Sequence, residues 1–268
     1  MSDEKAVALT VLSKTVWSDN LFSFTTTRPD GFRFEAGQFA RLGMNPSQLV
    51  ANQGKAICDE RIFRAYSIAS SPYDEHLEFF SVVVPDGAFT SQLQHLQVGD
   101  PLYLNPEPFG FLTLSRYQEP TPNDLWLLAT GTGLAPFLSM LGDLDTWQNY
   151  TDIVLAYSAR TETELAYVDK IKALHEQFAN LIDNPARLHF VPIITRQAVE
   201  GCLHHRIPAL IDSNQLQTHI GLALNPDTSH VMLCGNPDMV EDTKEALKNQ
   251  GLTMNRRGVG NIAVENYW

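Results

Sequence analysis

The sequence has few cysteines and no long apolar run. Its three cysteines, Cys58, Cys202 and Cys234, lie far apart and form no CxxC pair. This spacing excludes an iron–sulfur cluster held by four cysteines, argues against a structural zinc and fits a reducing compartment. No apolar run approaches the roughly 18 residues of a membrane-spanning helix, and the charged residues 1–5 lack the apolar core of a signal peptide. We therefore expect a cytoplasmic protein without a membrane segment.

Positive charge is also scarce. Lys and Arg number 19 against 31 Asp and Glu, which gives a net charge of −12 and argues against nucleic acid as a partner. A basic patch can still lie on an acidic molecule, so the net charge leaves a protein partner open. With 268 residues, of which 44% are hydrophobic, the chain suits two domains of ordinary size.

The N-terminal part, residues 1–118, is predicted to form an antiparallel β-barrel with one helix. Stretches rich in Val, Thr, Phe and Ser alternate with turns of Gly, Pro, Asp and Asn, which is typical of short strands. The strands are expected at residues 6–17, 21–28, 37–44, 64–70 and 77–84. Residues 89–97 have apolar side chains on one helical face, and residues 44–62 are expected to form a long surface loop.

Residues 119–268 are predicted to form a second, α/β domain. A proline-containing stretch at 117–125 is the candidate linker, and apolar strands alternate with helices after it, which indicates a parallel sheet. Strands are expected at 124–130, 152–160, 187–196 and 229–235, and helices at 163–178 and 237–249. Asn236 as the cap, Pro237 at the first position and Gly251 at the end support the last helix.

A glycine turn between the first of these strands and a helix indicates a nucleotide-binding site. Gly131 and Gly133 would allow a tight turn and close approach by a pyrophosphate. The helix that follows would direct unpaired N–H groups and its positive dipole end at the anion. The GxGxx(G/A) pattern is weak alone, and Pro136 takes its last place. An ordinary strand–helix turn therefore remains the alternative.

Three arginines are expected at the edge of the sheet where ligands bind, beyond the carboxyl ends of the strands. Arg160 and Arg196 end two strands, and Arg206 precedes a helix that begins near Pro208. Guanidinium groups favour the 2′-phosphate of NADP, whereas an acidic residue at the ribose would favour NAD. Each arginine alone is as well explained by solvation, but the three together favour NADP.

Cys234 and Gly235 end another strand at the same edge. A thiol is small and polarizable, and it could pack against a nicotinamide without competing strongly for hydrogen bonds. The alternative is a buried cysteine that packs as a small apolar residue.

Two further motifs suit a flavin. Arg64, Tyr66 and Ser67 bring a cation, an aromatic ring and a hydroxyl together on a predicted strand of the barrel, as a flavin and its pyrophosphate would require. The sequence ends in Tyr267 and Trp268. An indole at this position can stack on the flat flavin ring, for about 0.5–1.5 kcal/mol beyond area burial.

These motifs, in this order and spacing, resemble the ferredoxin–NADP⁺ reductase family. The resemblance is to its bacterial branch of ferredoxin/flavodoxin–NADP⁺ reductases, whose chains end in an aromatic residue. It covers nearly the whole chain, from AGQF at residues 36–39 to ENYW at 265–268. The resemblance rests on four motifs, each of which is a weak signal alone but which are specific together: RxYS, GTGxxP, CGNPxM and ENYW. The loop at 44–62 looks longer than the family's compact turn, which leaves its role open.

The resemblance implies an enzyme that exchanges a hydride between NADP(H) and FAD and single electrons with a ferredoxin or flavodoxin. It implies FAD contacts at Arg64, Ala65, Tyr66, Ser67, Phe80, Ser81, Val82, Ala88, Phe89, Thr90, Thr132, Tyr267 and Trp268. It implies NADP contacts at Gly131, Gly133, Ala159, Arg160, Thr195, Arg196, Arg206, Cys234, Gly235 and Asn236. Ser67, Cys234 and Glu265 are the implied catalytic residues, near flavin N5, the nicotinamide and the proton path.

Two other functions fit parts of the pattern. An NAD(P)H-dependent flavin reductase or an oxygenase reductase component would use the same fold, but it would turn over free flavin or serve a different acceptor. A redox-sensing flavin-binding module without enzyme activity could keep the barrel motif, but it would have no need for the three arginines or Cys234.

Overall fold

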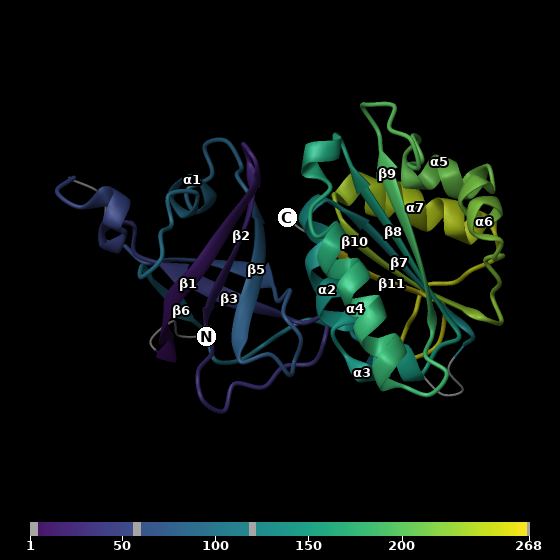
Figure 1. The fold of residues 1–268 in the computed structure, drawn as a ribbon, viewed down its shortest axis with the longest axis horizontal. Helices are drawn as coiled ribbons and strands as arrows, with labels where there is room; N and C mark the ends of the chain where they lie inside the picture. Colours follow the sequence, from purple (N-terminus) through teal and green to yellow (C-terminus); the bar gives the residue numbers. More distant parts are fainter. Residues whose placement is uncertain (1–4, 56–59, 118–121, 267–268) are drawn as a thin grey trace.

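The computed structural model describes residues 5–55, 60–117 and 122–266 and contains two sheets side by side (Figure 1). The first sheet is antiparallel and has six strands in the order β4-β3-β6-β1-β2-β5. Its strands are β1 (Val7–Ser18), β2 (Leu21–Thr27), β3 (Phe39–Met44), β4 (Ile62–Ser67), β5 (His76–Val82) and β6 (Pro101–Leu104). A bridge between Ile68 and Phe79 joins the two outer strands. The sheet therefore curls around a core that includes Phe24, Phe79 and Leu42, and the predicted antiparallel barrel is confirmed.

The barrel differs from its prediction in three places. The expected helix 89–97 is only one turn, α1 (Thr90–Leu93), because the amides of His95 and Leu96 bond three residues back rather than four. The strand β6 was not predicted, since it is short and begins at a proline. The described part of the expected surface loop is folded into two 3₁₀ turns, η2 (Pro46–Gln48) and η3 (Val50–Asn52), and Leu49 between them is buried.

The second sheet is parallel, as predicted, with five strands in the order β11-β10-β7-β8-β9. Its strands are β7 (Asp124–Thr130), β8 (Asp152–Ala159), β9 (Arg187–Ile194), β10 (Ser229–Gly235) and β11 (Ile262–Asn266). From β7 the chain moves outward to β9 and then returns to add β10 on the other side of β7. The point between β7 and β10 is therefore the topological switch point, where open parallel sheets bind ligands.

Helices cover both faces of this sheet (Figure 1). One face packs against α2 (Ala135–Leu141), α3 (Leu144–Gln148) and α4 (Val168–Leu181), and the other against α5 (Ile207–Asp212), α6 (Gln215–Ile220) and α7 (Pro237–Asn249). Strand alternation divides the two cores: Leu125 and Leu127 of β7 face one side, and Trp126 and Leu128 face the other. In the part of the chain that the structure describes, no helix has the length and apolarity to cross a bilayer.

The helix α4 begins five residues later than the expected residue 163. A 3₁₀ turn, η6 (Glu162–Glu164), follows β8, and Tyr167 then adopts a left-handed conformation with φ +66°. A left-handed residue cannot continue a right-handed helix, so α4 begins at Val168. The caps of α7 are as predicted, because the Asn236 side chain accepts hydrogen bonds from the amides of Asp238 and Met239.

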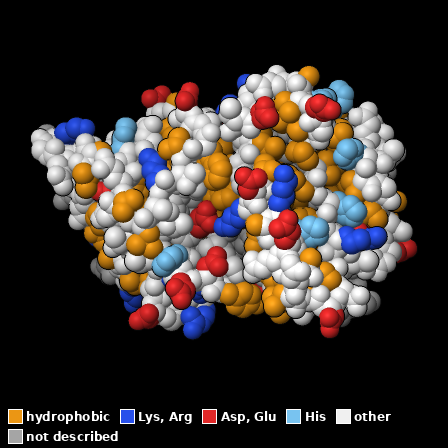
Figure 2. Space-filling view, in the orientation of Figure 1, with side chains coloured by type: hydrophobic (Ala, Val, Ile, Leu, Met, Phe, Trp, Pro, Cys, Tyr) orange, Lys and Arg blue, Asp and Glu red, His pale blue; other side chains and the backbone are white. Residues whose placement is uncertain are grey.

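The two domains contact each other through a shared apolar cluster and through polar and aromatic side chains. Tyr167 is buried, packs against Trp17 with a centroid separation of 4.7 Å and donates a hydrogen bond to Glu78 Oε1 at 2.8 Å. Lys170 binds the second oxygen of Glu78. Figure 2 shows acidic and basic side chains gathered over the junction of the domains on this face. The Tyr117 hydroxyl also contacts the second sheet, at 3.1 Å from the carbonyl oxygen of Val231. The predicted boundary at 118/119 falls outside the described residues.

Candidate active site

The RxYS motif lies on β4 and divides its side chains between solvent and the barrel. Arg64 and Ala65 are exposed, whereas Ser67 is buried. The Tyr66 ring packs beside Phe89, with ring centroids 5.7 Å apart, and its hydroxyl lies 3.0 Å from Ser81 Oγ. Burial raises the pKa of Tyr66 to about 12, so the phenol stays protonated at neutral pH. The structure therefore brings together predicted residues from β4, β5 and the start of α1.

The turn before α1 contains backbone amides that have no acceptor among the described residues. The N–H of Val84 is bound by Thr90 Oγ1 at 3.0 Å, and the N–H of Gly87 donates to the Val84 carbonyl at 3.1 Å. Among the residues described, none accepts a hydrogen bond from the N–H groups of Ala88, Phe89 or Thr90. Successive free amides form a concave site that suits phosphate oxygens. The predicted segment from Ala88 to Thr90 therefore fits the pyrophosphate of FAD.

The β5 residues on either side of Ser81 face the second domain. Phe80 is buried and meets the Tyr167 ring edge-on at a centroid distance of 5.0 Å. Val82 is half-buried and packs on the same cluster. Strand alternation gives this result, because residues 80 and 82 lie on one face and residues 79 and 81 on the other. The side chain of Phe80 thus has protein contacts of its own, and its predicted contact with FAD stays a prediction.

The two glycines of the GTG turn have different roles. Gly131 has φ +54°, and a β-carbon added there would meet nothing within 4 Å, so this backbone is open to a ligand. A β-carbon on Gly133 would lie 2.2 Å from the Cys234 carbonyl oxygen, and one on Gly235 would lie 2.2 Å from Thr130 Oγ1. Gly133 is therefore required for the close approach of protein backbone at the switch point, a reason that the sequence did not reveal.

The ends of β8 and β9 place four predicted residues side by side. The amide of Thr195 donates to the Ala159 carbonyl at 3.1 Å, and that of Arg196 to the Arg160 carbonyl at 2.9 Å. Both arginine side chains are exposed. Arg206 precedes α5 as predicted, and its exposed side chain borders a shallow cavity of about 410 Å³ between α5 and α7. Thus the ends of β8 and β9 bring Arg160 and Arg196 together, whereas the cavity that Arg206 borders is lined by residues of α5 and α7.

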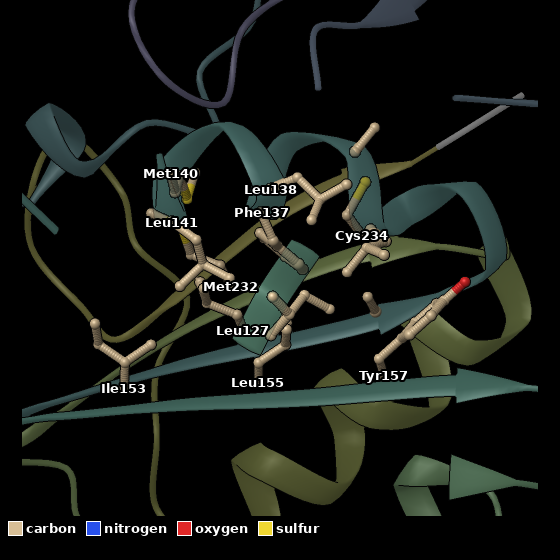
Figure 3. Close-up of a cluster of buried hydrophobic side chains, with 14 of the residues drawn as sticks. Leu127, Phe137, Leu138, Met140, Leu141, Ile153, Leu155, Tyr157, Met232 and Cys234 are labelled. Carbon is tan, nitrogen blue, oxygen red and sulfur yellow. The ribbon is translucent and has the colours of Figure 1, made fainter. Parts of the chain in front are cut away.

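Cys234 lies at the end of β10 and is fully buried in the apolar cluster beneath α2, near Leu138 and Phe137 (Figure 3). This surrounding matches the simpler alternative of a small packing residue. A contact between Cys234 and the nicotinamide stays a prediction. Gly235 and Asn236 follow at the same edge, where the Asn236 amide donates to Thr130 Oγ1 at 3.0 Å. Thr132 is half-buried in the neighbouring turn.

Glu265 reaches from the last strand toward the barrel. It is the register partner of Cys234, and a β-carbon placed on Gly110 would lie 3.5 Å from Glu265 Oε2. The residue before that glycine is bridged to Phe39, which is the register partner of Ser67. The structure thus brings Glu265 to the same edge of the barrel as Ser67. Burial raises the pKa of Glu265 to about 7, so its carboxyl group can exchange a proton near neutral pH.

Two residues of the site were not anticipated. Gly110 leaves space beside the catalytic candidate Glu265, since an added β-carbon would lie 3.5 Å from Glu265 Oε2, and Glu164 binds Arg160. Glu164 lies four residues after an arginine that was itself predicted, so its spacing was the available signal. Tyr267 and Trp268 lie outside the described residues, and their stacking on a flavin stays a prediction.

A barrel that offers free amides to a phosphate, joined to a parallel sheet with a glycine turn at its switch point, defines a two-domain oxidoreductase that uses a flavin and a nicotinamide. Family models agree: residues 10–107 match the oxidoreductase FAD-binding domain, and residues 127–245 match the oxidoreductase NAD-binding domain.

Individual relatives show which family within this class of oxidoreductases the chain resembles. The chain is 40% identical over 252 residues to a ferredoxin–NADP reductase of Pseudomonas aeruginosa, which covers 92% of this chain and 91% of that protein. It is 39% identical over 257 residues to a flavodoxin/ferredoxin–NADP reductase of Escherichia coli, with 94% of each covered. It also superposes on a crystal structure of a ferredoxin NADP⁺ reductase from Neisseria gonorrhoeae with bound FAD and NADP. The TM-score is 0.85 at 34% identity, over 98% of both chains. The chain belongs to the ferredoxin/flavodoxin–NADP reductase family.

Proposed function

We propose that this enzyme transfers electrons between NADP(H) and a ferredoxin or flavodoxin through bound FAD. The observation that carries the proposal is the arrangement at the domain junction. Glu265 of the nucleotide-binding domain lies against the edge of the barrel that carries Ser67, within reach of the switch point that the glycine turn lines. The chemistry that bound FAD supplies is the conversion between two-electron exchange with a nicotinamide and one-electron exchange with a protein carrier.

The barrel residues would hold FAD by its charge and its ring. The free amides of Ala88, Phe89 and Thr90 suit the pyrophosphate, and the exposed guanidinium of Arg64 would add a charge-assisted hydrogen bond. Tyr66 is fixed by its hydrogen bond to Ser81 and by packing on Phe89. A ring that is already fixed can position the flavin without losing further side-chain freedom.

The second domain would hold NADP(H) at its switch point. The left-handed turn at Gly131 leaves its backbone open for the nucleotide, and Arg160, Thr195, Arg196 and Arg206 would bind the 2′-phosphate. Of these, Arg160 and Arg196 are joined directly by a backbone hydrogen bond. Guanidinium groups bind phosphate through paired hydrogen bonds. The preference for NADP(H) over NAD(H) should therefore depend on these side chains.

Proton movement is assigned to Glu265 with Ser67. A carboxyl group with a pKa of about 7 is balanced between its acid and base forms at neutral pH, which suits proton exchange in either direction. Ser67 is buried on β4, and its hydroxyl can both donate and accept a hydrogen bond. Cys234, next to Glu265 across the strand pair, would form the wall against the nicotinamide.

The carrier should be an acidic protein despite the net charge of −12. Arg256 and Arg257 lie in the turn before β11, and their backbone leads directly to the strand that carries Glu265. Arg116 connects the barrel to this turn, since its Nε donates a hydrogen bond to Asn255 Oδ1 at 3.2 Å. Among the arginines of the barrel, Arg28 is bound to main-chain carbonyl groups, including that of Phe32. The positive potential would therefore come from Arg256 and Arg257, together with three other arginines of the barrel, Arg33, Arg41 and Arg61. Location in the cytoplasm stays a prediction from the scattered cysteines.

A visible absorption spectrum followed by anaerobic titration tests this proposal. The purified protein should be yellow, carry about one FAD per chain and be bleached by NADPH at lower concentrations than by NADH. A colourless protein that FAD cannot reconstitute would refute it. Turnover of added riboflavin or FMN without retained FAD would instead favour the flavin reductase.

A further inference from the structure

Arg160, one of the arginines assigned to the 2′-phosphate, is already bound by a carboxylate of this chain. Glu164 lies in the 3₁₀ turn η6, four residues after it. Glu164 Oε2 accepts hydrogen bonds from the Arg160 amide at 3.1 Å and from its Nε at 3.0 Å, and Oε1 accepts one from Nη2. Both carboxylate oxygens of Glu164 thus bind Arg160. The edge of the Arg160 guanidinium that carries Nε and Nη2 is occupied by this carboxylate.

This pair is more firmly held than an ordinary surface ion pair. The Glu164 side chain is only 16% exposed, whereas that of Arg160 is 48% exposed. The Tyr157 hydroxyl donates to the Glu164 carbonyl at 3.2 Å, which ties the turn to the end of β8. A fixed carboxylate loses little side-chain entropy when it holds its partner, unlike the long flexible chains of most exposed pairs.

Glu164 carries its negative charge at neutral pH. Burial raises the pKa of Glu164, but the hydrogen bonds and charge of Arg160, together with the charge of Arg196, outweigh burial and hold it below its ordinary value. Glu164 therefore offsets part of the positive charge that Arg160 and Arg196 bring to the ends of β8 and β9. A phosphate that approaches meets both an occupied edge of Arg160 and a like charge.

We infer that Glu164 is a specificity-determining residue that competes with the 2′-phosphate of NADP(H) for Arg160. The inference rests on the proposed function, which assigns that phosphate to Arg160 and Arg196. Through this competition the enzyme holds NADP(H) less tightly than its arginines alone would allow. Release of the oxidised or reduced nucleotide is then faster, which matters where product release limits turnover.

Calorimetric binding to the FAD-loaded protein tests this with two small probes, 2′-AMP and 5′-AMP, which differ in the position of the phosphate. Glu164→Gln keeps the size of the side chain and one oxygen acceptor for Arg160 but removes the charge. It should bind 2′-AMP about threefold to fivefold more tightly than the wild type and 5′-AMP equally well. Glu162→Gln is the matched control, because Glu162 lies exposed in the same turn. This control should leave both affinities within about twofold of the wild type.

The outcomes separate the inference from the function on which it rests. Unchanged or weaker binding of 2′-AMP by Glu164→Gln overturns the inference, because Glu164 would then orient Arg160 or be idle. If Glu162→Gln gains as much affinity for 2′-AMP as Glu164→Gln, the inference is also overturned. The gain would then come from removing any nearby negative charge and not from competition for Arg160. If the wild type binds 2′-AMP no better than 5′-AMP, the assignment of the 2′-phosphate site fails as well. The flavin absorption spectrum of each variant confirms that it is folded.

Discussion

The pKa of Glu265 predicts a particular dependence of stability on pH. Burial raises this pKa from an ordinary value of 4.5 to about 7 in the folded chain. Between these two values the folded protein retains a proton that the unfolded chain has lost, so the free energy of unfolding falls as pH rises. The difference corresponds to about 3 kcal/mol, at about 1.36 kcal/mol for each tenfold change. This part of the stability is present below pH 4.5 and is lost as pH rises through about 7.

Glu265→Gln replaces the carboxyl group with a neutral side chain that resembles its protonated form. The free energy of unfolding of this variant should equal that of the wild type near pH 4.5 and exceed it by up to about 3 kcal/mol at pH 8. Urea unfolding of the FAD-loaded protein, followed by tryptophan fluorescence, measures both values. Trp126 and Trp147 are fully buried in the second domain and report its unfolding. The same variant should lose any inflection near pH 7 in the turnover of NADPH.

Glu245→Gln is the matched control, because Glu245 is a glutamate on α7 whose pKa is held below its ordinary value by its hydrogen bond to Lys248. It should show no gain in stability at pH 8. If the wild type and Glu265→Gln lose the same free energy between pH 5 and pH 8, then Glu265 titrates normally. Its assignment to the proton path would lose its physical basis.

Three further predictions concern the nucleotide, the carrier and the chain end. Replacing Arg196 and Arg206 with alanine should raise the KM for NADPH by at least about tenfold, since each charge-assisted hydrogen bond contributes about 1.5–3 kcal/mol. The KM for NADH should hardly change, and equal losses with both nucleotides would show that the arginines support the fold. Reduction of an acidic carrier should slow steeply as salt rises above about 0.15 M, where the Debye length is about 8 Å; a rate independent of salt would contradict the proposed docking. Deletion of Trp268 should tighten nicotinamide binding, improve NADH relative to NADPH and alter the flavin spectrum, whereas an unchanged preference and spectrum would indicate a tryptophan packed elsewhere.

The sequence predicted the elements whose local signals are strong. Apolar runs such as that of β8, in which all eight residues are buried, have no competing interpretation once they alternate with helices. The α7 helix was predicted with its ends because Asn236, Pro237 and Gly251 are local signals. By contrast, the start of α4 depends on Tyr167, which is left-handed and packs against Trp17 of the other domain. Tertiary contacts of this kind leave no trace in the neighbouring sequence.

In the candidate active site, too, features with local sequence signals were predicted and features set by tertiary contacts were not. Residues that belong to continuous motifs, such as Tyr66 and Arg160, could be proposed from the sequence. Tyr66 lies on β4 and Arg160 directly follows β8, and their contacts with FAD and NADP(H) stay predictions. Contacts that join distant segments were not predicted. Gly110 beside Glu265 depends on how the two domains meet, and the role of Gly133 depends on how closely β10 approaches the glycine turn.

Electron transfer to a carrier tests the central claim most directly. Catalytic amounts of the FAD-loaded protein are mixed without oxygen with NADPH and an excess of a bacterial flavodoxin or ferredoxin, and the carrier's absorbance is followed. The account predicts that the carrier is reduced to completion, much faster with NADPH than with NADH. The opposite result would contradict the account: NADPH reduces the bound FAD and free FMN is reduced readily, but both carriers stay oxidised.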